Sequence, residues 1–323
     1  MGYGDVMTHT LRLGTRGSTL ARMQSQLVAD ALEKGHPGLG VELRVITTTG
    51  DRIVDQPLHE AGGKGLFTKE LELALLAGEI DFAVHSYKDV PVTMPLVDPS
   101  GLLIAATPER ADPRDVLISR EGAKRLSDLP SGAKVGTGSL RRISQILQAR
   151  PDLRVVPIRG NIDTRLRKLA DGQYDAVVLA LAGLLRTSLF DAAWMTPMPT
   201  EELLPAPGQG ALALQCRRDD GSTRMVLRLL HHPTTELCVA AERELVQMLG
   251  GDCHSPIGVL ANLSGETIRM RAAIGARDGR PPIISAGAVG PATNPSSVVA
   301  QLYHALCERG VQSHLRGDPG QHP

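Results

Sequence analysis

Residues 133–142 read AKVGTGSLRR, and this stretch decides how the chain is expected to fold. A short β-type run ends in a glycine-rich turn, and Ser139 stands where it can cap a helix that starts at Leu140. Nearly the same turn occurs at residues 14–18, where GTRGS differs from the GTGS of residues 136–139 by one residue. Each copy predicts a strand that runs directly into a helix.

The sequence around these turns repeats one order of elements up to about Gly183. The first pass predicts strands at 11–14, 41–47 and 82–85 and helices at 18–34 and 68–77. The second pass predicts strands at 133–136, 153–158 and 176–179 and helices at 140–148 and 163–170. A second shared text, GEID at 78–81 and GQYD at 172–175, precedes the third strand of each pass.

This alternation is typical of βαβ units with largely parallel pairing. We therefore expect two similar α/β domains that face each other across a cleft, with chance similarity of βα turns as the alternative. A proline-rich linker at 197–207 leaves the second domain, and the apolar run at 210–216 is expected to return to the first as a strand.

The pattern changes after Pro233. A helix is predicted at 234–249, followed by strand-like runs with turn signals between them and a last helix; these runs are 258–263, 267–275 and 282–288, and the helix is 296–309. The fold class is thus α/β with a smaller α+β C-terminal domain that has an antiparallel three-stranded sheet. The expected domains are residues 1–108 with 207–229, residues 109–206, and residues 230–323.

Composition limits the function. Lys and Arg together number 35, as do Asp and Glu, and a net charge of zero disfavours nucleic acid or an anionic membrane as a general partner. No apolar run is long enough to span a membrane, and we expect no signal peptide. No two of the four cysteines have C-x-x-C spacing, which disfavours a zinc site and favours free thiols in the cytoplasm.

Five arginines lie at or just beyond the ends of predicted strands: Arg16, Arg141, Arg142, Arg159 and Arg165. A helix start after a glycine turn is a natural anion site, and arginine binds carboxylates through two parallel hydrogen bonds. We interpret the set as a site for a small molecule with several carboxylates, although phosphate is an equally good partner on these grounds. The alternative is a solvated basic face.

Three further segments could carry chemistry. HSYKDVP at 85–91 offers Lys88 as another cation and Asp89 as a candidate for stabilising a cationic intermediate or moving protons, unless Asp89 is only a turn residue. The long unpatterned stretch 48–65 is predicted to be a lid. GGDCHSP at 250–256 places Cys253 in a glycine-rich turn, although a lone cysteine is more often inert.

Taken together, these segments resemble the porphobilinogen deaminase family, also called the hydroxymethylbilane synthases. The resemblance extends in order over about residues 11 to 310, and the matching texts are GTR at 14–16, GGKGLF at 62–67, HSYKDVP at 85–91, GTGSLRR at 136–142, RGN at 159–161, PGQG at 207–210 and the Cys253 loop.

The resemblance implies three domains, the first two like the lobes of periplasmic binding proteins. It implies a transferase of tetrapyrrole and haem biosynthesis that deaminates porphobilinogen and joins four units head to tail on a dipyrromethane cofactor. This cofactor would be attached to Cys253 by a thioether, and hydroxymethylbilane would be released. The resemblance implies porphobilinogen as the partner. We also expect a cytoplasmic monomer and, from the charge balance and the lack of a long apolar run, no nucleic acid and no membrane.

The matching positions carry implied roles. Asp89 corresponds to the catalytic acid. The positions that hold the cofactor's acetate and propionate groups are Lys88, Ser139, Arg141, Arg142 and Arg165, and those around the incoming substrate are Arg16, Ser18, Arg159 and Arg186. Three positions depart from the usual pattern: Tyr87 replaces a common Met, Gly138 a common Ser and Asp252 a common Gly.

Two rival functions remain open at this level. A non-catalytic two-lobed receptor for an organic anion would take up its ligand without ammonia release. An enzyme acting on phosphorylated substrates would be inhibited by phosphate but not by polycarboxylates.

Overall fold

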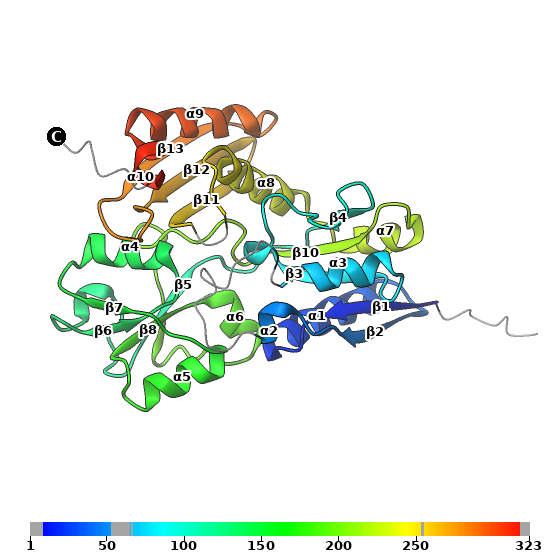
Figure 1. Ribbon diagram of the computed structural model, residues 1–323, viewed down its shortest axis with the longest axis horizontal. Coiled ribbons are helices and arrows are strands. Elements are labelled where there is room, and N and C mark those ends of the chain that lie inside the picture. Colours follow the sequence, from blue (N-terminus) through cyan, green and yellow to red (C-terminus); the bar gives the residue numbers. More distant parts are fainter. Residues whose placement is uncertain (1–8, 53–64, 66, 253–254, 317–323) are drawn as a thin grey trace, which may run out of the picture. The chain divides into compact units, whose positions relative to one another are not determined.

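The computed structural model describes residues 9–52, 65, 67–252 and 255–316 of the chain. The chain divides into two compact units (Figure 1). The first contains Met1–Arg110 and Ala211–Glu236, and the second contains Ala111–Gly210 and Leu237–Pro323. Each unit is considered by itself below.

The first unit is built on a five-stranded mixed sheet. In sheet order its strands are β2 (Leu39–Val45), β1 (His9–Thr15), β3 (Phe82–Ser86), β10 (Leu212–Arg217) and β4 (Leu102–Ala106). β1 pairs in parallel with β2 and β3, whereas β10 is antiparallel to both β3 and β4. The helical elements are α1 (Thr19–Gly35), α2 (Thr49–Arg52), α3 (Lys69–Leu76), η1 (Tyr87–Asp89), α7 (Gly221–Leu227) and η3 (Arg228–Leu230).

Alternation along each strand gives this sheet two apolar faces. Phe82 of β3 faces the cluster that contains Leu32 of α1, and Ala83 faces the cluster that contains Leu75 of α3. All four side chains are buried. The two helices therefore cover opposite faces of the sheet, which leaves the strand ends free to present polar residues.

The second unit contains a sheet with the same plan. Its order is β7 (Arg154–Val156), β6 (Lys134–Gly136), β8 (Ala176–Ala180), β5 (Asp115–Ser119) and β9 (Met195–Pro197). β6 is parallel to β7 and β8, and β5 is antiparallel to β8 and β9. Its helical elements are η2 (Leu126–Asp128), α4 (Leu140–Ala149), α5 (Ile162–Ala170) and α6 (Leu181–Arg186).

The internal repeat predicted from the sequence is confirmed, and its second shared text has a structural reason. Asp81 accepts a hydrogen bond from the backbone N–H of Arg12 at 2.7 Å and returns one from its own N–H to the Arg12 carbonyl at 2.8 Å. Asp175 makes the same exchange with Lys134 at 2.7 and 2.9 Å. The acid thus joins the start of β3 to the middle of β1 in the first sheet, and the start of β8 to the start of β6 in the second.

The expected pairing was wrong in one respect. Only the first three strands of each sheet, in sheet order, pair with one another in parallel, because β10 and β5 are antiparallel to both of their neighbours and make the sheets mixed. The returning strand at 210–216 is confirmed as β10, but β4, β5 and β9 were not anticipated. Their short apolar runs lack an adjoining amphipathic helix that would have marked a βα unit.

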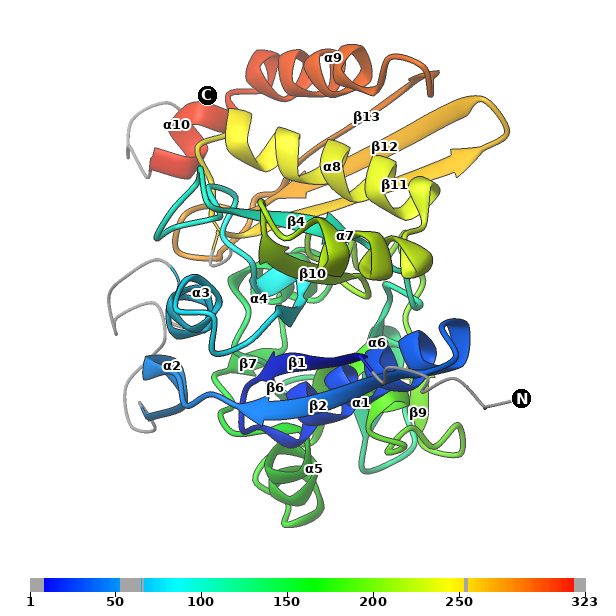
Figure 2. The same ribbon diagram turned by 90° about the vertical axis from the view of Figure 1, so that its right-hand side faces the viewer.

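A third sheet lies in the C-terminal part of the chain (Figure 2). Its strands β11 (Ile257–Ser264), β12 (Thr267–Ile274) and β13 (Ile284–Pro291) pair antiparallel in sequence order. The remaining helices are α8 (Pro233–Met248), α9 (Pro295–Glu308), which packs on β12 and β13, and α10 (Val311–Arg316). The predicted fold class is confirmed, whereas the predicted domain limits stay a prediction.

Candidate active site

Arg141 and Arg142 start helix α4 and are bound to one buried acid. Arg141 Nη1 lies 2.8 Å from Asp115 Oδ2, and Arg142 Nη2 lies 2.7 Å from Asp115 Oδ1. The Asp115 side chain has no exposed surface. Burial alone would raise the pKa of Asp115, but the charges of the two guanidinium groups and their hydrogen bonds hold it well below its usual range. The bland alternative of a solvated basic face is therefore wrong for these two residues.

The remaining donors of this pair are only partly satisfied. Arg142 Nη1 donates to the carbonyl of Val178 at 2.9 Å, and Arg141 Nη1 donates to that of Leu204 at 2.6 Å. Arg141 Nε is buried and has no hydrogen-bond partner among the residues that the structure describes. Two cations share one carboxylate, so a net positive charge remains at the start of α4.

Three further arginines of the second unit are half-buried and form no ion pair with any residue that the structure describes: Arg159, Arg165 and Arg186. Burial, with added repulsion from Arg142 and Arg159, lowers the pKa of Arg165 to about 10. Burial also lowers the pKa of Arg186 to about 10. Arg165 Nε donates to the Gly160 carbonyl at 2.8 Å. These are cations in surroundings that disfavour charge, which a bound anion would relieve.

Ser139 stands at the N-cap position of α4 but its side chain makes no capping hydrogen bond. Ser18, at the same position of α1, accepts a hydrogen bond from the backbone N–H of Ala21 at 3.3 Å. Both serines are half-buried. The two repeats therefore differ in how the hydroxyl at the helix start is used.

The candidate residues of the first unit follow strands β1 and β3. The Arg16 guanidinium lies 3.9 Å from the centroid of the Phe67 ring, which holds it in a cation–π contact. Lys88 and Asp89 lie in the single turn η1 directly after β3, where Lys88 is half-buried and Asp89 is exposed. The acid is thus accessible to a ligand from solvent.

A buried polar chain that the sequence reasoning missed lies behind this turn. His85 Nε2 and Gln215 Oε1 are 3.0 Å apart, and Gln215 Nε2 donates to Glu72 at 3.1 Å. Because an amide oxygen only accepts, His85 donates through Nε2. Burial, opposed in part by the Gln215 bond and reinforced by the charge of Arg16, lowers the pKa of His85 to about 4. The neutral imidazole anchors the strand that carries Ser86 into the turn.

Asp115 was also missed, because its partner Arg141 lies 26 residues further along the chain. The one available signal was an acid at the first position of the apolar run DVLIS. Cys253 falls outside the described residues, as does most of the predicted lid at 48–65. The expectation that the arginines of both units face one cleft with Asp89 between them stays a prediction.

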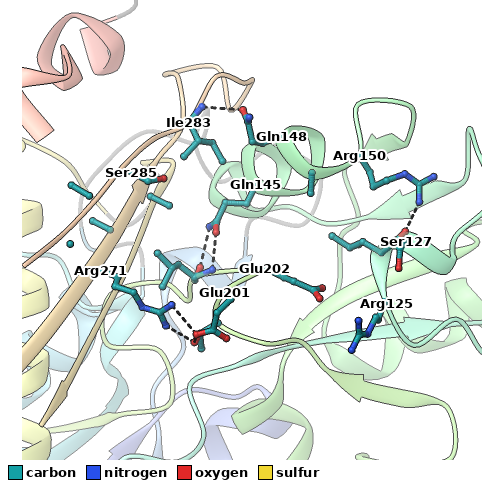
Figure 3. A pocket seen from close by; sticks show the side chains of 18 of the residues that line it. Arg125, Ser127, Gln145, Gln148, Arg150, Glu201, Glu202, Arg271, Ile283 and Ser285 are labelled. Carbon is teal, nitrogen blue, oxygen red and sulfur yellow. Dashed lines mark hydrogen bonds and ion pairs between the residues drawn. The ribbon is translucent and has the colours of Figure 1, made fainter. Parts of the chain in front are cut away.

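A cavity of about 840 Å³ opens elsewhere in the second unit, between α4 and strands β12 and β13 (Figure 3). Two of its arginines are ion-paired: Arg271 lies 2.9 Å from Glu201, as Figure 3 shows, and Arg150 lies 2.6 Å from Asp152. None of the predicted site residues lines it. Its size alone therefore does not make it the active site.

The described residues contain neither a membrane-spanning helix nor a metal-binding cluster. In residues 9–52, 65, 67–252 and 255–316, no helix has the length and apolar character needed to cross a membrane. Within the same ranges, no group of three His, Cys, Asp or Glu side chains could hold a metal ion. Cys216 and Cys307 are free thiols, as predicted.

The fold is α/β, with two sheets of one plan and a third, antiparallel sheet. Its second unit holds Arg159, Arg165 and Arg186, which form no ion pair with the described residues, so the chain is an α/β protein of a kind suited to binding an organic anion. The chain belongs to the porphobilinogen deaminase family. The model of the porphobilinogen deaminase dipyrromethane cofactor binding domain matches residues 11–225, and that of the C-terminal domain matches residues 236–308.

Curated relatives agree. A porphobilinogen deaminase from Roseiflexus sp. (strain RS-1) is 46% identical over 311 residues, covering 96% of this chain and 100% of the relative. One from Syntrophobacter fumaroxidans (strain DSM 10017 / MPOB) is 50% identical over 276 residues, covering 83% and 85%. The family, the activity and the cofactor implied by the sequence resemblance are confirmed.

Solved structures with similar arrangements are distant. The methionine-binding protein MetQ has a TM-score of 0.44 at 14% identity, covering 72% of this chain and 94% of MetQ. The periplasmic VFT2 domain of Bordetella pertussis BvgS has a TM-score of 0.38 at 17% identity, covering 68% and 85%.

The chain is thus a transferase of tetrapyrrole and haem biosynthesis that acts with a dipyrromethane cofactor. It deaminates porphobilinogen and joins four units head to tail, releasing hydroxymethylbilane. The residues present fit such a carboxylate-rich group, because Arg141 keeps a buried, unpartnered Nε and the half-buried Arg165 has a lowered pKa without an ion pair among the described residues.

Proposed function

We propose a division of labour among the predicted site residues. In this proposal Asp89 is the catalytic acid. The carboxylates of the dipyrromethane are held by Lys88, Ser139, Arg141, Arg142 and Arg165, and those of the incoming porphobilinogen by Arg16, Ser18, Arg159 and Arg186. Cys253 is the point of attachment.

One observation carries the proposal: the half-buried Arg165 and Arg186 have pKa values lowered to about 10 and no ion pair within the described part of the chain. A carboxylate placed against either side chain would offset this unfavourable burial. Charge-assisted hydrogen bonds are worth roughly 1.5–3 kcal/mol each, so a few of them can hold a polycarboxylate firmly. The family assignment favours carboxylate over phosphate as the anion.

Asp89 would act on the positive charge that develops as porphobilinogen loses ammonia. Its exposed carboxylate can accept hydrogen bonds from pyrrole N–H groups and stabilise that charge electrostatically. When bound, the dipyrromethane supplies the nucleophilic pyrrole carbon. Lys88 and the arginines would hold the dipyrromethane and the incoming porphobilinogen by their carboxylates in the orientation needed for reaction. Less entropy is then lost when the two react.

The division of labour is tested by one arginine from each group. Arg165→Leu is expected to impair formation of the covalent adduct, measured by intact mass. Arg186→Leu is expected to form the adduct normally but to raise KM for porphobilinogen by about tenfold or more, as loss of a charged hydrogen bond should. Arg167→Leu is the matched control, because Arg167 is exposed on the same helix as Arg165. Wild-type adduct formation and KM in both test variants would overturn the assignment.

We further propose that the enzyme acts as a cytoplasmic monomer that binds no nucleic acid. The balance of 35 basic and 35 acidic residues supports the last point. Sedimentation velocity with and without a DNA duplex tests the monomeric state and the lack of nucleic-acid binding, and a dimer or a co-sedimenting complex would contradict them.

A further inference from the structure

The Pro207–Gly210 turn is a sequence motif to which none of the proposed roles above assigns a function. Gln209 within it is 1% exposed. Its Nε2 donates to Asp115 Oδ1 at 2.9 Å and to the Pro113 carbonyl at 2.7 Å. Asp115 is the acid that binds Arg141 and Arg142. The turn is therefore connected to the buried arginine pair through Asp115.

The geometry at Asp115 shows what Gln209 adds. Asp115 Oδ1 accepts from Arg142 Nη2 at 2.7 Å as well as from Gln209, and Oδ2 accepts from Arg141 Nη1 at 2.8 Å. The two arginines alone would let the carboxylate turn with them. Gln209 is a neutral donor fixed to the backbone at Pro113, so it restrains the carboxylate and with it both guanidinium groups.

The same turn contacts a third arginine. Arg186 Nη2 donates to the Gly210 carbonyl at 2.6 Å. Gly210 has φ +89°, and a Cβ there would overlap the Ala111 carbonyl, so the turn admits no side chain at this position. The path of the turn is therefore fixed where it meets Arg186.

The turn is also tied to helix α8, which ends at Met248 shortly before the Cys253 segment. The backbone N–H of Gly208 donates to Glu242 Oε2 at 2.7 Å, and Glu242 Oε1 accepts from the Ala261 N–H at 2.9 Å. Glu242 has no exposed surface. One turn thus connects the arginines of the second sheet with the elements on either side of the proposed attachment cysteine.

We propose that Gln209 is a positioning residue: acting through Asp115, it aims Arg141 and Arg142 at the carboxylates of the bound pyrrole group. This inference rests on the proposed roles of the two arginines. Gln209 touches neither substrate nor cofactor in this account. Its effect arises because small displacements of a binding group reduce both affinity and rate steeply.

The test compares Gln209→Leu with Ser119→Ala in protein made by cells unable to produce porphobilinogen. Ser119 lies at the other end of β5, is 2% exposed and loses one hydrogen bond, to the Glu121 N–H, when truncated. Two readouts are used: calorimetric binding of benzene-1,2,4,5-tetracarboxylate, and the rate of adduct formation by intact mass after porphobilinogen is added.

Gln209→Leu is expected to weaken tetracarboxylate binding and to slow adduct formation by about tenfold, while Ser119→Ala leaves both at wild-type values. In an Arg142→Lys background, Gln209→Leu should add less than about twofold, because both changes act on one contact. Wild-type binding in Gln209→Leu, or a full additional loss in the double variant, would overturn the inference.

Three further outcomes keep the test decisive. If Gln209→Leu does not fold, Gln209→Asn, which keeps an amide but shortens its reach, replaces it and must show the same deficit. If the wild-type protein forms no adduct, the proposed function fails, while tetracarboxylate binding still decides the role of Gln209. If the wild-type adduct forms and Gln209→Leu is unimpaired, only the positioning inference fails.

Discussion

The two α/β sheets share a plan but bury different polar groups on their equivalent antiparallel strands. In the second sheet, the antiparallel strand β5 begins with Asp115, which carries two buried ion pairs. In the first sheet, the equivalent strand β10 carries Gln215, which bridges His85 and Glu72. The second sheet therefore fixes cations behind a helix start, whereas the first fixes a turn that ends in an exposed acid.

This difference teaches how a duplicated framework can divide one reaction. The acid–backbone exchange at Asp81 and Asp175 is the same in both sheets and maintains the strand arrangement. The two units differ in the residues beyond their strand ends. The second unit holds Arg159, Arg165 and Arg186, which form no ion pair with the described residues, whereas the first holds Lys88 and Asp89. In this account, the second unit mainly binds carboxylates and the first mainly acts on charge as it develops.

The largest expected effect tests the acid of the first unit. Asp89→Ala should lower turnover by about 10²–10³-fold or more, because the developing positive charge loses its counter-charge. The fold should persist, since Asp89 is exposed. Ammonia release is the measurement, and Asp30→Ala, an exposed acid on α1, is the control. Normal ammonia release by Asp89→Ala would remove the acid from its proposed role.

The buried acid of the second unit should matter most for stability. Asp115→Asn leaves two buried guanidinium groups without their carboxylate and should lower the free energy of unfolding by roughly 3–5 kcal/mol. Gln215→Leu in the first unit should lower it by only about 1–3 kcal/mol, the loss for unsatisfied polar groups. Urea titrations compare the two. Equal losses would show that the sheets do not differ as described.

The pH dependence of stability should report on His85. Its pKa is lowered from 6.5 to about 4 by burial, so the unfolded chain binds the proton more readily than the folded chain. Stability is then fully present above pH 6.5 and falls as pH drops toward 4, with a slope of up to about 1.4 kcal/mol per pH unit. His85→Gln should flatten this slope. If the slope is unchanged in the variant, it arises from titratable groups other than His85.

The smallest expected effects distinguish the serines at the starts of helices α1 and α4. Ser18→Ala removes a capping bond and should destabilise the protein by about 0.5–2 kcal/mol. Ser139→Ala removes no capping bond, so stability should stay within about 0.5 kcal/mol of wild type while adduct formation slows. Thermal unfolding measures the change in stability, and intact mass measures adduct formation. A stability loss at Ser139 equal to that at Ser18 would mean that the hydroxyls have the same use.

Local signals in the sequence predicted much of this architecture. The glycine turns located the starts of α1 and α4, and the repeated acid before the third strand foretold the duplication. Contacts between distant residues were beyond such signals. Asp115 could not be paired with Arg141, nor Gln209 with Asp115, because both contacts depend on the antiparallel entry of β5, and its short apolar run carried no helix beside it.

The proposal most important to this enzyme's chemistry is that Arg141, Arg142 and Arg165 help to hold a polycarboxylate pyrrole group joined to Cys253. Intact-mass measurement of protein purified from cells able to make porphobilinogen tests it most directly. Wild-type protein and Cys307→Ser, a half-buried free cysteine that serves as control, should both carry the added mass of two pyrrole units. Cys253→Ser should carry none. An unmodified wild-type chain, or an adduct that persists in Cys253→Ser, would contradict the account.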